Sequence, residues 1–204
     1  MADFAFDFAA PLAARLREAV DIEGKLPRAL LALGLPAVGD VALLGDPDGW
    51  HAARLASAGV GVQSVTIAEP FRLDLPDGSL DAIVSLWSGF SGIDPAARDE
   101  ADRVLRDDGR LLVVHDYGRD EVSALRSGDG PEYTSWSRRG GPFLRDGGFR
   151  IHVLHCFWTF ATIEQARDLL AAAFGARGVA VGAALARPRL SWKVAIYHRT
   201  RPRA

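Results

Sequence analysis

The stretch LPDGSLDAIVS, residues 75–85, decides the fold of this chain. A turn of proline, aspartate and glycine stands directly before an apolar run, which is typical of a strand that enters a buried sheet. The sequence after this run predicts a helix with Asp94 as its N-cap and Pro95 in its first turn. Gly109 is expected to end this helix, and the apolar run from Leu111 to His115 is expected to form the next strand. This order of elements indicates an α/β fold.

The same alternation extends toward the N-terminus. Apolar runs predict strands at Val41 to Leu44, Val62 to Ala68 and Ala82 to Trp87, and a helix at about residues 49–58. Short apolar strands separated by helices are typical of a mostly parallel sheet with helices on both faces.

The two ends of the chain complete the prediction. Apolar residues at helical spacing predict a helical segment of two short helices at about residues 8–36. Beyond a short helix at Pro142 to Asp146, strands are expected at Phe149 to Phe157 and at Ser191 to Tyr197. Between these strands the capping box TIEQ, residues 162–165, predicts a helix. We expect residues 1–204 to form a single domain.

Composition limits the partners that the sequence favours. The formal net charge is −2 and the pI is about 6.2, so neither nucleic acid nor a membrane surface is expected as a partner. No apolar run has membrane-spanning length, and the acidic residues near the N-terminus are not typical of a secretory signal. With a single cysteine, Cys156, the chain has no intramolecular disulfide, and a cytoplasmic location is expected.

Two segments carry a resemblance to a known family. Residues 75–85 and residues 100–114, EADRVLRDDGRLLVV, resemble the fourth strand and the helix, glycine turn and fifth strand of class I S-adenosylmethionine-dependent methyltransferases. The resemblance implies a Rossmann-like fold with a mostly parallel sheet and an antiparallel C-terminal strand. Between Gly45 and Asp81 the chain is too short for two strand-and-helix units, so we expect the fold to be one α/β unit short.

The resemblance also assigns a cofactor site. Gly45 and Gly49 match the first and third glycines of the family's cofactor turn, and Asp46 lies between them. The middle glycine is replaced by Pro47, which lacks an amide hydrogen, and Leu43 replaces the usual acidic residue on the first strand. These residues are equally consistent with a turn that binds no cofactor and whose acidic residue caps the following helix.

The acidic residue that should bind the ribose has two alternative positions. If Val62 to Ala68 is the family's second strand, Thr66 stands where the acid should be. If it is the third strand, Glu69 matches the acidic residue near the adenine, and the second strand has been lost. The distance from Glu69 to the turn at residues 75–81 favours the latter alignment.

Candidate catalytic residues follow the fourth and fifth strands of the resemblance. His115 and Asp116 are expected as bases, and Leu86 and Trp87 are expected beside the cofactor. Methyl transfer depends largely on proximity, so a strong catalytic motif is not required. A local packing role for each residue remains the alternative.

Two further groups carry weaker signals. His152 and His155 are an odd number of positions apart on a strand and therefore face opposite sides, so no metal site is expected there or at Cys156. Arg138 and Arg139 are expected in a solvated loop, with an anionic acceptor or a partner as the alternative.

Two functions remain open at this point. One is a methyltransferase that uses S-adenosylmethionine and acts on a small-molecule acceptor. The other is a cofactor-free protein of the same fold, a pseudoenzyme that serves as a binding or partner module and self-associates through its N-terminal helices or an open sheet edge. A nicotinamide-dependent oxidoreductase is disfavoured, because no G-x-G-x-x-G follows the first strand.

Overall fold

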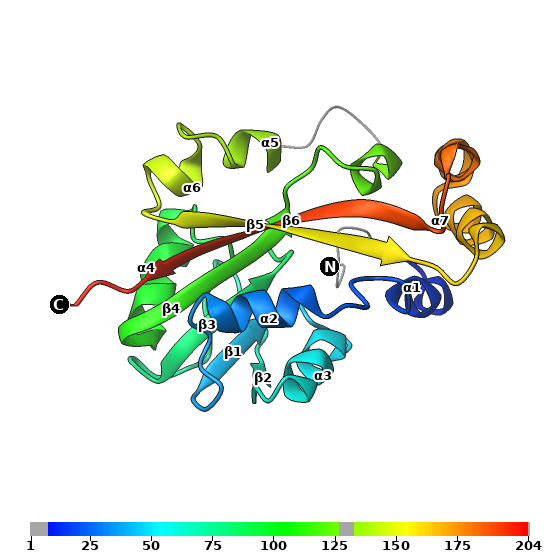
Figure 1. The fold of residues 1–204 in the computed structure, drawn as a ribbon. Coiled ribbons are helices and arrows are strands. Elements are labelled where there is room, and N and C mark those ends of the chain that lie inside the picture. Colours follow the sequence, from blue (N-terminus) through cyan, green and yellow to red (C-terminus); the bar gives the residue numbers. More distant parts are fainter. Residues whose placement is uncertain (1–7, 127–132, 204) are drawn as a thin grey trace.

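The computed structural model describes residues 8–126 and 133–203, which form one six-stranded sheet flanked by helices (Figure 1). The strand order is β2-β1-β3-β4-β6-β5. Strands β2, β1, β3 and β4 run parallel, and β6 is antiparallel to both of its neighbours. The bounds are β1 Val41–Leu44, β2 Gln63–Ser64, β3 Leu80–Leu86, β4 Leu105–Asp116, β5 Arg150–Thr159 and β6 Arg189–Thr200. The predicted fold class, with its antiparallel C-terminal strand, is confirmed.

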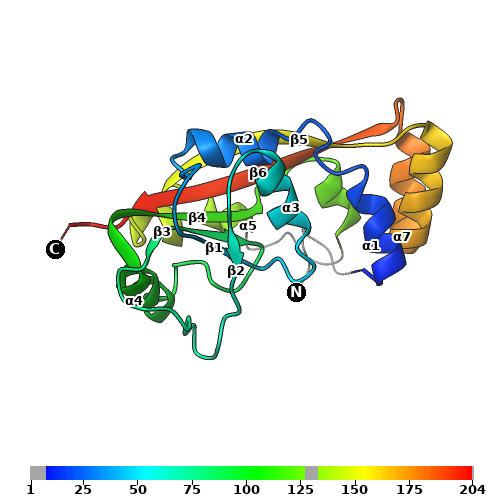
Figure 2. The same cartoon turned by 90° about the horizontal axis from the view of Figure 1, so that it is seen from below.

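Helices cover both faces of this sheet. Figures 1 and 2 show α2 on one side and α4 on the other. The first face buries Leu30 of α2 and Leu55 of α3, whereas the second buries Ala97 of α4 and Phe143 of α6. The bounds are α1 Ala10–Arg17, α2 Lys25–Ala32, α3 Trp50–Ser57, α4 Pro95–Val104, η1 Val122–Leu125, α5 Tyr133–Trp136, α6 Pro142–Arg145 and α7 Ile163–Ala184.

The β3-α4-β4 unit is built largely as the sequence predicts. The Asp94 Oδ1 atom accepts a hydrogen bond from the backbone N–H of Ala96 at 2.8 Å and so caps α4. The prediction that Gly109 ends the helix is wrong. The helix ends at Val104, and β4 begins at Leu105 with extended backbone. The left-handed turn that precedes the main apolar run belongs to Asp108, with φ of 63°.

The outer strand β2 is shorter than predicted. Only Gln63 and Ser64 pair with β1, whereas the apolar alternation suggested a strand from residue 62 to residue 68. Both paired residues are exposed, and among residues 8–126 and 133–203 β2 pairs only with β1. A strand at an open edge has no second ladder to continue it, and the chain turns back between Ala68 and Arg72 instead.

The helix predicted between β5 and β6 is α7, and it is kinked rather than continuous. Figure 1 shows β5 and β6 extending beyond the body of the sheet toward α1 and α7. Gly175 interrupts α7 with φ of 55° and ψ of −132°, so that its two halves fold against each other. A Cβ atom on Gly178 would lie 1.8 Å from the carbonyl oxygen of Leu170, so this contact requires glycine.

Candidate functional site

The turn after β1 makes a close contact with β3. Gly45 has φ of 84°, and a Cβ atom built on it would lie 2.1 Å from the carbonyl oxygen of Leu86. Gly49 also has a positive φ, of 70°, but faces open space. Both residues therefore favour glycine for their backbone, and only Gly45 requires it for packing.

Asp46 is committed to helix α3. It is 5% exposed, its Oδ1 accepts from the backbone N–H of His51 at 3.0 Å, and its Oδ2 accepts from the N–H of Ala52 at 2.8 Å. These amides belong to the first turn of α3, where a carboxylate is favoured by unsatisfied N–H groups and by the helix dipole. The geometry therefore matches the structural interpretation of the turn, in which its acidic residue caps the following helix.

A cleft lies at the carboxyl ends of β1 and β2. Its volume is about 340 Å³, and it is lined by Gly45, Asp46 and Pro47 from the first strand's turn and by residues 64–67 from the second. Thr66 lines this cleft, whereas Glu69 is exposed and does not. The role of Glu69 near the adenine therefore stays a prediction. The turn between Ala68 and Arg72 carries Glu69 away from the residues that line this cleft.

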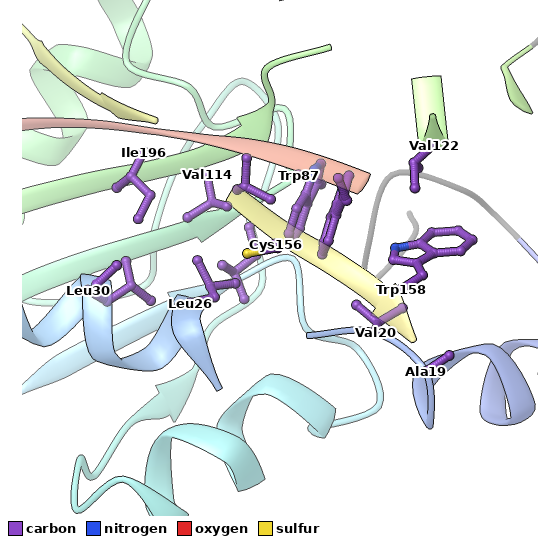
Figure 3. Close-up of a cluster of buried hydrophobic side chains, with 14 of the residues drawn as sticks. Ala19, Val20, Leu26, Leu30, Trp87, Val114, Val122, Cys156, Trp158 and Ile196 are labelled. Carbon is purple, nitrogen blue, oxygen red and sulfur yellow. The ribbon is translucent and has the colours of Figure 1, made fainter. Parts of the chain in front are cut away.

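Trp87 and Asp116 belong to a buried polar cluster. The indole Nε1 atoms of Trp87 and Trp192 each donate to Asp116 Oδ1 at 3.1 Å, and Arg126 forms an ion pair with the same carboxylate. The two indole rings stack with centroids 5.6 Å apart. Trp87 and the end of β5 lie together in the core (Figure 3). Asp116 is 2% exposed, so its carboxylate serves this cluster rather than open solvent.

The two candidate bases point to opposite faces of the sheet. Asp116 lies on the face that carries Trp192, whereas the His115 ring contacts Trp136, with centroids 5.0 Å apart, and Phe143 on the other face. Successive residues of a strand alternate between faces, and both residues belong to β4. His115 and Asp116 therefore cannot act together on one acceptor, although the sequence places them side by side.

Two buried histidines carry strongly lowered pKa values. Burial lowers the pKa of His115 to about 4 and the pKa of His51 to about 3, since a buried imidazole loses the hydration that favours its charged form. The His51 ring stacks on Trp87 with centroids 5.8 Å apart. Both histidines are therefore neutral at neutral pH, and His115 is available only as an uncharged imidazole.

These pKa values predict how stability depends on pH. The folded pKa of each histidine lies below its ordinary value of 6.5, so between pH 6.5 and about 4 the unfolded chain binds more protons. The free energy of unfolding should fall as pH falls through this range, by up to ~1.4 kcal/mol per pH unit for each histidine. Urea unfolding from pH 4 to 7 measures the slope. His115→Leu should reduce it, and the exposed His152→Gln should not; equal slopes in all three proteins would contradict the burial argument.

The remaining predicted residues lie away from these contacts. His152 and His155 are exposed on β5, and Cys156 is buried beneath α2. Arg138 and Arg139 are exposed between α5 and α6. Within residues 8–126 and 133–203, no group of three histidine, cysteine, aspartate or glutamate side chains is arranged to hold a metal ion. No helix in these ranges is both long and apolar enough to span a bilayer.

Sequence reasoning missed Trp192 and Arg126, which complete the Asp116 cluster. Trp192 lies 76 residues from Asp116 in the sequence, and neither Trp192 nor Arg126 belongs to a motif. The pairing of β4 with β6 brings Trp192 close, because Asp116 is opposite Val194 in the register. An apolar strand that carries a tryptophan gives no signal of this partner.

Comparison with known proteins identifies the fold. No protein-family model and no curated protein matches the sequence. Among solved structures, a provisionally described type II methyltransferase from Anaeromyxobacter dehalogenans has a TM-score of 0.54 and 19% identity, covering 89% of this chain and 97% of its own. A provisionally described methyltransferase in complex with the Trm112 activator, from Haloferax volcanii, has a TM-score of 0.50 and 14% identity. This match covers 95% of the present chain and 94% of the other.

A geranyl diphosphate methyltransferase in complex with GPP and sinefungin has a TM-score of 0.49 and 18% identity, covering 94% of this chain and 81% of its own. At these identities the likeness concerns the fold alone. This chain has the Rossmann-like fold of the class I S-adenosylmethionine-dependent methyltransferases.

Proposed function

We propose that this chain is a methyltransferase-like protein whose S-adenosylmethionine site is weakened. The observation that carries the proposal is the cleft of about 340 Å³ at the ends of β1 and β2, which keeps Gly45 but has Thr66 where a ribose-binding acid is expected. Its volume lies near the lower end of the ~300–1,000 Å³ typical of small-molecule sites.

The lining of the cleft supports weak rather than tight binding. Both carboxylate oxygens of Asp46 are held by amides of α3, and Pro47 offers no N–H group. Thr66 has a hydroxyl in place of a charge. A hydrogen bond to a charged group contributes about 1.5–3 kcal/mol, so its loss weakens binding by about 10- to 100-fold.

The end of β3 supports the same conclusion. In this fold the ligand lies beyond the carboxyl ends of the strands. The side chain of Trp87, at the end of β3, is 8% exposed and is held by Asp116 and by stacking on Trp192 and His51. A cofactor that extends from the cleft toward β3 therefore meets a fixed aromatic wall rather than a flexible loop.

The cofactor supplies an electrophilic methyl group, and the chain's own residues would bind and orient the reactants. His115 is neutral and buried, and Asp116 is occupied by three donors, so neither is poised as a base in this conformation. This arrangement favours acceptors that need no deprotonation, for which proximity and alignment supply the rate. We propose a small molecule as the acceptor if transfer occurs.

Isothermal titration tests the weakened site. With S-adenosylmethionine or S-adenosylhomocysteine, we expect dissociation constants of ~10 to 100 µM or weaker, if an intact site binds near ~1 µM. Low-micromolar binding of either ligand would overturn the proposal. A thermal shift with the same ligands gives an independent readout, since a ligand that binds only the folded state stabilises it.

Thr66→Asp should restore part of the affinity. The new carboxylate would face the cleft beside Gly45 and could accept hydrogen bonds from ribose hydroxyls, so we expect S-adenosylmethionine to bind about 10- to 100-fold more tightly. Titration of both proteins measures the change. Glu69→Gln is the matched control and should leave the affinity unchanged, because Glu69 does not line the cleft. Weaker binding in Glu69→Gln with no gain in Thr66→Asp would instead support the alignment that the sequence favoured.

The second candidate function is a cofactor-free partner module. The observation that favours it is β2, a two-residue strand with exposed residues at one edge of the sheet. Such an edge presents backbone groups that can pair with another strand. Self-association in size-exclusion chromatography with light scattering, together with no heat-stability gain from S-adenosylmethionine, would favour this function over methyl transfer.

A further inference from the structure

A second hollow in the described part of the chain lies outside the cofactor cleft. A groove of about 610 Å³ is lined by residues 17–31 on one side and by helix α3 on the other. None of its lining residues belongs to the cleft at the ends of β1 and β2. The volume falls within the ~300–1,000 Å³ typical of small-molecule sites.

Guanidinium groups supply most of the charge of this groove. Arg17, Arg28 and Arg54 line it. Arg28 is exposed and, within residues 8–126 and 133–203, it makes no hydrogen bond or ion pair, although the Glu23 carboxylate interacts with its charge at longer range. Arg17 donates to Asp48 at 2.8 Å, and its guanidinium carbon lies 5.9 Å from the centre of the Trp50 ring, so Arg17 is held by its own contacts. Arg28 is therefore the guanidinium of this groove that is best placed to meet a ligand.

The nearby carboxylates only partly offset these cations. Asp21 is 3% exposed, accepts from the backbone N–H groups of Lys25 and Leu26, and pairs with Arg54 at 2.9 Å. This carboxylate is therefore occupied by its own partners. Glu18 is the other acid in the lining, so three arginines face two carboxylates.

Apolar side chains form the rest of the wall. Ile22 is 59% exposed, one of three large hydrophobic residues with such exposure in the described ranges. Leu31 and Trp50 are half-buried beside it, and Pro27 is buried. An apolar surface next to an exposed guanidinium matches a ligand with an apolar body and a negative charge.

We propose that this groove binds small organic acids with an apolar body, with the anionic group on Arg28 and the body against Ile22 and Trp50. The site is separate from the proposed cofactor cleft and does not depend on methyl transfer. An exposed arginine rather than Lys suits a carboxylate, because the planar guanidinium can donate two parallel hydrogen bonds.

Titration with a matched pair of probes tests the charge preference. 2-Naphthoate and 2-naphthylmethylammonium share a ring system and differ in the sign of their charge. By isothermal titration we expect 2-naphthoate to bind with a dissociation constant of ~1 mM or lower, and the ammonium probe to bind at least ~10-fold more weakly. Equal binding of the two probes would overturn the proposal. So would the absence of 2-naphthoate binding at a probe concentration 10-fold above the expected dissociation constant of ~1 mM.

Variants locate the binding within the groove. Arg28→Gln should weaken 2-naphthoate binding at least ~5-fold, because a charge-assisted contact is lost. Arg15→Gln is the matched control: Arg15 is exposed on α1 and does not line the groove, so binding should be unchanged. Equal losses in both variants would show a general charge effect and would contradict the assigned site. S-adenosylmethionine binding should not change in Arg28→Gln, which separates this result from the test of the cofactor cleft.

Discussion

Replacing Asp116 with alanine is expected to lower the free energy of unfolding by about 3–5 kcal/mol, the usual cost of removing one partner from a buried ion pair. The side chain accepts from two indole N–H groups and pairs with Arg126, whose side chain is 16% exposed. Without the carboxylate, these donors lose a common acceptor in a site closed to water. Urea unfolding measures the loss, and tryptophan fluorescence should change as well, because Trp87 and Trp192 lose the same partner.

Two variants separate charge from shape in this experiment. Asp116→Asn keeps an oxygen acceptor for the indoles but removes the charge opposite Arg126, so its loss should lie between those of the wild type and Asp116→Ala. Asp99→Asn is the surface control, because Asp99 is exposed on α4 and should change stability by less than ~0.5 kcal/mol. Full stability in Asp116→Ala would mean that the wild-type carboxylate does not hold this cluster together. The structural role assigned to Asp116 would then be wrong.

The sequence predicted the central unit of the fold because its signals are local. The cap at Asp94 and the apolar run of β3 depend on neighbours within a few residues, and the observed α4 and β3 match them. The end of α4 at Gly109 and a strand over residues 62–68 were predicted wrongly, because tertiary contacts decide where these two elements end. The pairing of Leu80 with Leu105 brings residue 105 into β4 directly after α4, and β2 is cut short because it has no outer neighbour.

The sequence specified less of the candidate site. The alternation of a strand separates His115 from Asp116, as it separates His152 from His155, so the two candidate bases face opposite sides of the sheet. The cap formed by Asp46 was foreseen as an alternative, since an acid five or six residues before a helical N–H is a local feature. The position of Glu69 outside the cleft depends on how the chain turns after β2, which no spacing in the sequence specifies.

Gly45→Ala should lower the free energy of unfolding by about 2–5 kcal/mol. A positive φ costs an L-residue about 1–2 kcal/mol, and forced overlap in a packed region adds about 1–3 kcal/mol. The added Cβ atom would lie 2.1 Å from the carbonyl oxygen of Leu86, which belongs to the backbone of β3, so relief requires β1 and β3 to separate at their carboxyl ends. Urea unfolding measures the loss.

Gly49→Ala is the matched control within the same turn. Gly49 also has a positive φ, but a Cβ atom there meets nothing within 4 Å, so only the backbone cost of about 1–2 kcal/mol should remain. The difference between the two variants therefore measures the close approach of the turn to β3. Equal losses would mean that the turn and β3 separate without cost, and the wall formed at the end of β3 would then be less rigid than a weakened cofactor site requires.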